Sequence, residues 1–178
     1  DDGGDHWTSE GQSCDLPVTI ENARPFVSCI DDDEASIRIG THVVDAHDQP
    51  WLYCSMPESP HGLMWHRTAA GWRSTDLDAA LPGLNFAAQG RSTATSRATD
   101  GRTHLLISTQ AAGAGEGWYH PANELHHIAF TPDGRVDGHR QLTQDDPNQA
   151  RWLPSIEYWN WAHADSCADG HWFTYTSG

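Results

Sequence analysis

The chain of 178 residues contains no lysine: its 10 basic residues are all arginine, against 25 aspartates and glutamates, for a net charge of −15. A surface this acidic repels the phosphates of nucleic acids and anionic lipids, so we expect no nucleic-acid partner and no membrane-surface binding. Long apolar runs are missing too, because no stretch approaches the about 18 residues that a transmembrane helix needs. An anionic ligand would need arginines close by to overcome the negative field.

Helical signals are also scarce. The chain has 16 glycines and 10 prolines spread along its length, and no long segment carries apolar residues at the 3.6-residue period of a helix. What the sequence does contain is 9 tryptophans and 37% hydrophobic residues, enough for a packed core. These features together favour an all-β domain.

Short strand-like runs recur between turn residues. A first group of four runs covers residues 37–45, 51–55, 63–68 and 72–75. A second group covers residues 91–96, 103–109, 124–130 and 135–142, and a third begins at residues 154–159 and 171–176. We therefore expect about three modules of antiparallel strands.

One hairpin position repeats in all three groups. The turn around Asp48 aligns with the turns around Asp100 and Asp169, and the successive intervals are 52 and 69 positions. Four-stranded units that repeat at about 40–50 residues are typical of a β-propeller, and a meandering β-sandwich is the alternative. The repeat favours an all-β fold of the propeller class, a partial β-propeller of about three four-stranded antiparallel blades.

A short motif near the start agrees with this interpretation. Asp2-Gly3-Gly4-Asp5-His6-Trp7 fits D-x-G-x-x-W, the core of the Asp-box between the third and fourth strands of many propeller blades. Its glycine permits a tight turn, and its tryptophan packs under the loop. With Leu16-Pro17-Val18-Thr19 and with Val44-Asp45 followed by Pro50, the motif resembles the BNR-repeat (Asp-box) β-propeller family, and within it the ulvan lyase-like branch of polysaccharide lyases.

The resemblance implies the C-terminal half of a seven-bladed propeller, and we expect both ends of the chain to be cuts through a larger one. Residues 1–178 would form a single partial propeller domain, divided into the end of one blade with a connector, two blades and a truncated blade, at residues 1–30, 31–80, 81–145 and 146–178. In such lyases the catalytic histidines and their tyrosine and arginine partners lie in earlier blades, here upstream of Asp1. The chain departs from the branch at Arg38-Ile39, where an Asn-Gln pair is usual.

Three residues are candidates for contacting substrate. The resemblance assigns Arg91 to an innermost strand, where its guanidinium could grip a uronate carboxylate with two hydrogen bonds; an ion pair with an aspartate of the next blade is the alternative. Glu157 could accept hydrogen bonds from sugar hydroxyls. Trp159 could stack on a sugar ring, although a tryptophan in each blade is also ordinary propeller core.

Strand pairing predicts a row of metal ligands. The first hairpin of the first group would set His42 opposite Cys54, and the next hairpin would set Cys54 opposite His66. Directly opposed residues share a sheet face about 5 Å apart, so the three side chains would form one row. One thiolate and two imidazoles suit a structural zinc, with a fourth ligand from a neighbouring blade or from His47 or His61. The alternative is a buried cysteine with two unrelated histidines.

The spacing of other histidines and cysteines allows two further predictions. His126 and His127 are adjacent on an expected strand, so their rings should point to opposite sheet faces. Cys14 and Cys29 flank one connecting segment, and a disulfide between them would close a loop of about 15 residues and contribute about 3 kcal/mol.

The sequence thus predicts a fragment of a secreted or periplasmic carbohydrate-active propeller, a polysaccharide lyase that cleaves uronate-containing polysaccharide by β-elimination. Its partners would be an acidic polysaccharide and the remaining blades of the same full-length chain. A sialidase-like glycoside hydrolase is one alternative, but that site needs three arginines on inner strands, and only Arg91 is assigned there. A non-catalytic carbohydrate-binding propeller is the other, because one fold hosts all three functions.

Overall fold

The computed structural model describes residues 7–9, 12–14, 16–17, 19, 38–45, 47–55, 61–86, 93–97, 101–114, 120–156 and 173–178. The chain divides into two compact units, Asp1–Ala35 and Ser36–Gly178, and each is described by itself. In the first unit, β1 (Trp7–Ser9) and β2 (Gln12–Cys14) form an antiparallel hairpin. Residues 2–6 of the Asp-box motif, and Cys29 of the predicted disulfide, lie outside the described residues.

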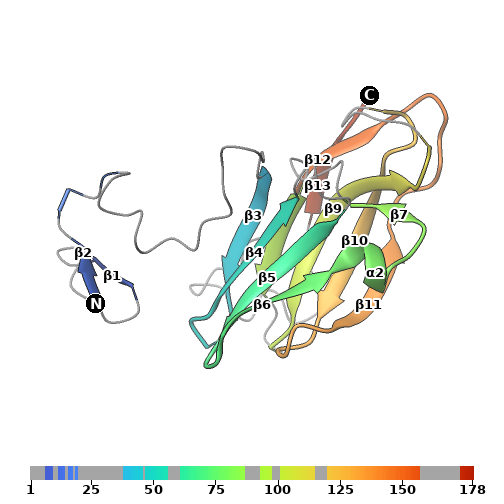
Figure 1. Ribbon diagram of the computed structural model, residues 1–178. Helices are drawn as coiled ribbons and strands as arrows, with labels where there is room; N and C mark the ends of the chain where they lie inside the picture. Colours follow the sequence, from blue (N-terminus) through green and yellow to red (C-terminus); the bar gives the residue numbers. More distant parts are fainter. Residues whose placement is uncertain are drawn as a thin grey trace. The chain divides into compact units, whose positions relative to one another are not determined.

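The second unit begins with a four-stranded antiparallel sheet whose strands follow one another in chain order (Figure 1). The strands are β3 (Arg38–Val44), β4 (Pro50–Ser55), β5 (Gly62–Thr68) and β6 (Gly71–Asp76). Burial alternates at the start of β5, where Gly62, Met64 and His66 are buried and the residues between them are half-buried. A period of two arises when one face of a strand covers the core. The first predicted group of four strands is therefore confirmed.

One carboxylate holds the loop between β3 and β4. Asp45 Oδ1 accepts hydrogen bonds from the backbone N–H groups of His47 at 2.8 Å and Gln49 at 2.9 Å. Asp45 Oδ2 accepts a third from Trp51 Nε1 at 3.0 Å. Asp48 in the same loop has a φ of 57°, a left-handed conformation that aspartate tolerates better than most residues. Asp45 thus fixes both the turn and the buried indole that follows it.

A single helical turn, α2 (Leu77–Ala80), follows the first sheet. Asp76 is its N-cap, because the Asp76 side chain accepts a hydrogen bond from the Ala79 N–H at 3.0 Å. The helix buries Leu77 and leads to the short strand β7 (Leu84–Asn85). The sequence did not predict this helix, since one turn is too short to show helical periodicity.

The second sheet contains a four-strand run like the first. Its strands are β8 (Thr93–Arg97), β9 (Thr103–Ala111), β10 (Glu124–Phe130) and β11 (Val136–Gln141). One edge of β9 pairs with β10, and its other edge pairs with β8 and, further along, with β7. Residues 103–110 of β9 are all buried, which requires cover on both faces of the sheet. This sheet confirms the second predicted group of strands.

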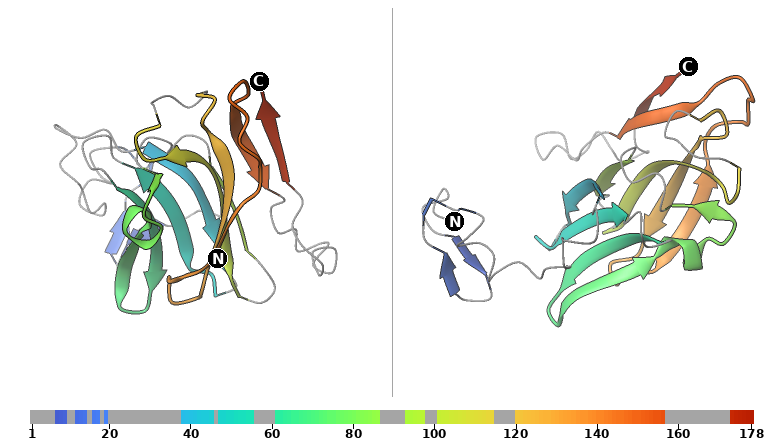
Figure 2. Two further views of the ribbon diagram at one scale, coloured as in Figure 1. Left: turned by 90° about the vertical axis from the view of Figure 1, so that its right-hand side faces the viewer. Right: turned by 45° about the horizontal axis from the view of Figure 1, so that its top comes forward.

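The third sheet is the hairpin of β12 (Arg151–Ile156) and β13 (Phe173–Ser177). β12 contacts β8, β9 and β10, and Figure 2 shows the hairpin beside them from two further directions. The Ser108 hydroxyl donates a hydrogen bond to the Arg151 carbonyl, and the Arg151 N–H donates one to the Asn123 carbonyl at 3.1 Å. The third sheet therefore covers the second face of β9. Both strands were predicted, but the first begins three residues earlier than expected, at Arg151 instead of Pro154.

One hydrophobic core joins the first and second sheets. Its buried side chains come from both sheets, from α2 and from the residue after β7; they are Val43, Trp51, Tyr53, Met64, Leu77, Phe86, Leu105, Ile107, Ile128 and Phe130. The Tyr53 hydroxyl donates a hydrogen bond to the Phe86 carbonyl at 2.7 Å, so the buried phenol is satisfied. Burying a large apolar side chain contributes about 1.5–3 kcal/mol, and this core therefore fixes the two sheets face to face.

The first strands of successive sheets lie against one another. β3 contacts β8, and the hydroxyl oxygens of Thr41 and Thr95 are 2.9 Å apart between them. β12, the first strand of the third sheet, contacts β8 as well. The described fold is thus all-β, with antiparallel sheets stacked so that their first strands meet. No described helix is long and apolar enough to cross a membrane.

Candidate functional site

The three residues predicted to contact substrate, Arg91, Glu157 and Trp159, lie outside the described residues. Arg91 precedes β8 in the sequence, and Glu157 directly follows β12.

The predicted pairing of the metal row is wrong. His42 pairs with Leu52 instead of Cys54, and His66 pairs with Trp51. The first pairing differs from the prediction by two positions, which preserves the sheet face, so His42 and Cys54 share one face. The second differs by three positions, and an odd shift turns His66 to the opposite face. His42, Cys54 and His66 therefore do not form one row of ligands.

The register error has a local cause. The ladder between β3 and β4 shifts between Ile39 and Thr41, which is a β-bulge or similar irregularity. In the second hairpin, β5 already begins at Gly62, so the connection is centred before Pro60. The predicted pairing of Cys54 with His66 requires a connection centred on Pro60 itself.

Cys54 and His66 are instead packed separately. Cys54 is buried, and this burial raises the pKa of its thiol. His66 is also buried and stacks on Trp51, with ring centroids 4.6 Å apart and planes 22° apart. Burial lowers the pKa of His66, and Arg73 adds to the effect, so this ring is held neutral in the core.

The prediction for the adjacent pair His126 and His127 is confirmed. His126 Nδ1 lies 3.0 Å from Nε2 of His139 on β11, whereas His127 Nε2 lies 2.8 Å from Nδ1 of His104 on β9. In each pair the two rings are stacked with planes 11° apart. His126 shares its face with the core residue Ile128, two positions along the strand, so His127 faces the third sheet.

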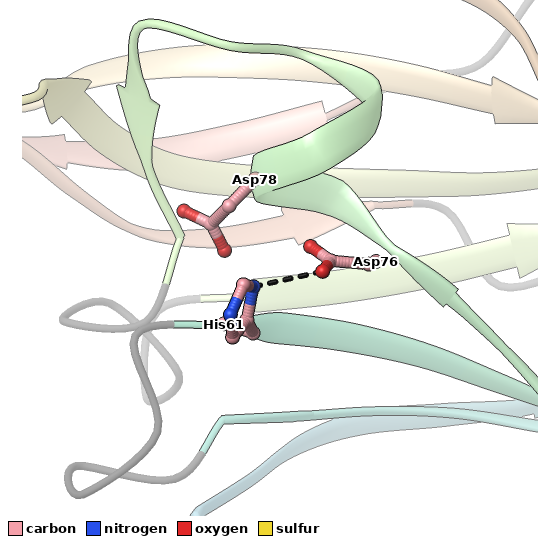
Figure 3. Close-up of side chains that lie close together, drawn as sticks. All are labelled: His61, Asp76 and Asp78. Carbon is pink, nitrogen blue, oxygen red and sulfur yellow. Dashed lines mark ion pairs between the residues drawn. The ribbon is translucent and has the colours of Figure 1, made fainter.

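His61, Asp76 and Asp78 form a cluster at the end of the first sheet, and Figure 3 shows their side chains close together. His61 Nδ1 lies 2.8 Å from Asp76 Oδ2, and one ligand atom from each residue lies within 4.8 Å of the others. The Asp78 carboxylate accepts hydrogen bonds from the backbone N–H groups of Gly62 at 2.7 Å and Phe86 at 3.1 Å. Asp76 caps α2, so both carboxylates already fasten the backbone of this corner.

Hydrogen bonding also sets the charge of Asp76. Burial on its own would raise the pKa of this carboxyl, but hydrogen bonds from the Ala79 N–H and from His61 outweigh it and lower the pKa. Asp76 is therefore ionised at neutral pH and suited to its role as a helix cap.

A larger concave site lies at one end of the second sheet. It is a pocket of about 590 Å³, within the size range of small-molecule sites. Polar side chains in its lining come from the start of β10, the end of β11 and the loops beside them. The ionisable residues of the lining are His120, Glu124, His126, Asp145 and Asp146. Leu84, Ala111, Ala114 and Pro121 are among the apolar residues of its wall.

Glu124 is the most unusual group in this pocket, because its side chain is only 4% exposed. Its Oε2 accepts a hydrogen bond from the Thr143 hydroxyl, while its buried Oε1 has no hydrogen-bond partner in the described part of the chain. Burial raises the pKa of Glu124, and the hydrogen bond from Thr143 and the charge of Arg151 oppose that shift. Glu124 thus lines the pocket with a largely buried carboxyl, one oxygen of which has no hydrogen-bond partner among the described residues.

Two histidines, His120 and His126, contribute imidazole rings to the pocket wall. Burial, with a further contribution from His139, lowers the pKa of His126 to about 4, so this imidazole is neutral at neutral pH. His120 Nδ1 accepts a hydrogen bond from the Ala122 N–H at 3.1 Å, so a neutral His120 carries its proton on Nε2 and can donate there. Asp145 is oriented by Gln141, whose Nε2 donates to its Oδ1 at 2.8 Å.

Comparison with known proteins gave no match: no protein-family model, no curated protein and no solved structure matches this chain. The chemistry of the molecule must therefore be inferred from its own residues and geometry.

The sequence prediction did not identify the pocket, although one signal pointed to it. Glu124 and His126 are two positions apart on a strand that was predicted, so they had to share a face. What could not be read from the sequence was that β7 and the loop with Asp145 and Asp146 lie beside this strand end.

Proposed function

We propose that this chain is part of a β-propeller that cleaves acidic polysaccharide by β-elimination. The observation that carries the proposal is the stacking of three antiparallel sheets whose first strands, β3, β8 and β12, meet through β8. Neighbouring propeller blades have this relation, because their first strands line a common axis. Two runs of four strands in chain order match the blade pattern.

The contacts of β8 with both β3 and β12 support the role expected for Arg91. Arg91 lies two residues before this strand in the sequence, and propeller ligands bind near the axis. A guanidinium there would form paired hydrogen bonds with a uronate carboxylate. Neutralising that carboxylate lowers the free energy needed to remove the proton on the adjacent carbon, which is the first step of elimination.

The overall charge makes such an arginine necessary. With a net charge of −15, the chain repels a polyuronate unless a local cation reverses the field. The chain has no lysine, so arginine is the only permanently charged side chain that can do this.

The test is an elimination assay on the full-length protein with uronate-containing polysaccharides. Elimination leaves a double bond conjugated to the carboxylate, so ultraviolet absorbance should rise with time. Arg91→Ala should slow the rise about 100-fold or more, the loss typical of removing one group that stabilises developing negative charge. Arg135→Ala is the matched control, because Arg135 is an exposed arginine paired with Asp133; this variant should keep the wild-type rate.

Two results would contradict the proposal. New reducing ends without a rise in absorbance would indicate hydrolysis, as in a sialidase-like enzyme. Binding of the polysaccharide without any product would indicate a carbohydrate-binding propeller.

A further inference from the structure

We propose that the pocket lined by Glu124 and His126 binds a hydroxylated organic cation, with an amino sugar as the ligand class that fits best. The inference rests on the pocket's own chemistry and does not depend on the elimination reaction. It concerns other residues than Arg91, because Glu124 and His126 belong to β10, whereas Arg91 precedes β8 in the sequence.

The buried carboxylate of Glu124 favours a ligand with a hydrogen-bond donor. Glu124 lines the pocket, and its buried Oε1 has no hydrogen-bond partner among the described residues, although the carboxyl accepts hydrogen bonds from the Thr143 hydroxyl, at Oε2, and from the Asp146 backbone N–H. Leaving a buried acceptor without a donor is unfavourable, more so for a charged group. A ligand that carries a hydroxyl or ammonium donor to Oε1 would remove that penalty.

The side chains that line the pocket are predominantly acidic. Glu124, Asp145 and Asp146 are acidic, and no arginine is among the described residues that line the pocket. His126 contributes no positive charge at neutral pH, because its imidazole is neutral there. The charge of Arg151 acts on Glu124 from outside this lining, but the described lining itself has three acidic side chains and no arginine, so it disfavours uronates, phosphates and sulfates and favours a cation.

A metal ion fits this lining poorly. Among the described residues, the one group of three or more histidine, cysteine or acidic side chains with ligand atoms within 4.8 Å of one another is His61, Asp76 and Asp78. The acidic groups of the pocket are thus too far apart to surround one ion, and they suit a ligand that spans the distance between them.

The wall of the pocket combines apolar side chains with hydrogen-bonding groups. Apolar side chains such as Leu84, Ala111 and Pro121 provide a surface for the C–H groups of a ring. Around them, Glu124 and Asp145 accept hydrogen bonds, and a neutral His120 donates from Nε2. A sugar ring with an ammonium group presents the matching donors, acceptors and charge.

The test measures binding to the full chain by isothermal titration calorimetry with three size-matched probes. The probes are a glucosamine trimer, a neutral glucose trimer and a galacturonate trimer. The glucosamine trimer should bind most tightly, and the galacturonate trimer should not bind. Equal binding of the glucosamine and glucose trimers, or no binding of the glucosamine trimer, would overturn the proposal.

Two variants localise the binding. Glu124→Gln should weaken binding of the glucosamine trimer about tenfold or more, the loss expected for one charge-assisted hydrogen bond. Ala111→Phe fills the pocket from an exposed position and should abolish binding even if Glu124→Gln folds poorly. Asp133→Asn, which changes an exposed carboxylate at the β10–β11 turn, is the control and should bind like the wild type. Unchanged binding in both pocket variants would refute the site.

Discussion

The contact between Gly134 and His66 offers a sensitive test of how the first two sheets pack. Gly134 lies in the turn between β10 and β11 with a φ of 89°, a conformation that glycine adopts without strain. A Cβ atom at this position would lie 2.3 Å from His66 Cε1 and 2.9 Å from His66 Nδ1. His66 cannot easily move away, because it is buried and stacked on Trp51. The turn is also fastened by the Thr75 hydroxyl, which donates to the Gly134 carbonyl at 2.5 Å.

The expected cost of Gly134→Ala has two parts. The left-handed backbone costs alanine about 1–2 kcal/mol, and forcing an extra methyl group into a packed core costs about 1–3 kcal/mol. We therefore expect the free energy of unfolding to fall by about 2–5 kcal/mol. Gly101→Ala isolates the backbone part, because Gly101 has a φ of 83° and its nearest neighbour would be Pro132 Cγ at 3.7 Å; that variant should lose only about 1–2 kcal/mol.

Urea denaturation of the variants, followed by tryptophan fluorescence, measures both losses. The decisive variant adds Gly134→Ala to His66→Ala, which removes the ring that the new methyl group would meet. In that background, Gly134→Ala should cost no more than Gly101→Ala does in the wild type, since the residues couple only through contact. An equal cost of Gly134→Ala with and without the His66 ring would refute the packing described for these two sheets.

Two other perturbations have expected outcomes. Asp45→Ala removes the acceptor of three hydrogen bonds, one of them from the buried Trp51 indole, and should cost about 2–4 kcal/mol in urea denaturation; Asp48→Gly, in the same loop, should change stability by less than about 1 kcal/mol. The pKa of His126 is about 4 in the folded chain and near 6.5 when unfolded, so the unfolded state binds more protons between these values. Stability should fall by up to about 3 kcal/mol as the pH drops from 7 towards 4. His126→Asn should remove that part of the pH profile, and His42→Asn controls for the loss of one imidazole. If the stability of His126→Asn fell with pH as steeply as that of the wild type, the buried environment described for His126 would be wrong. If Asp45→Ala were as stable as the wild type, the hydrogen bonds described for Asp45 would be wrong.

Strand positions could be predicted because turn residues and alternation are local signals. The run from Gly62 to Thr68 alternates between buried and half-buried positions over its first half, and it lies between two turns. The run 103–110 lacks alternation, yet it is a strand, because sheets cover both its faces. Its three consecutive apolar residues, Leu105, Leu106 and Ile107, are what burial on both faces favours.

Register could not be predicted, because it depends on where a loop is centred. A shift of a single position in a hairpin exchanges the two faces of a strand. No local feature of the sequence indicates where the connection before Gly62 is centred, or that the pairing of β3 with β4 shifts after Ile39. His66 was therefore predicted on the wrong face. The pocket around Glu124 escaped prediction for a related reason, since its wall joins residues from Leu84 to Pro147 that meet only after the sheet has formed.

Within the second unit, the three sheets meet through β3, β8 and β12. Thr41 on β3 and Thr95 on β8 are 54 positions apart in the sequence, and their hydroxyl oxygens are 2.9 Å apart. The most direct measurement is peptide mapping by mass spectrometry of the double variant Thr41→Cys, Thr95→Cys after mild oxidation. We predict a disulfide between positions 41 and 95, and none between 74 and 95 in the control Ser74→Cys, Thr95→Cys, because Ser74 lies on the far strand β6. No link between positions 41 and 95, or equal linking in the control, would show that β3 and β8 do not meet in this way.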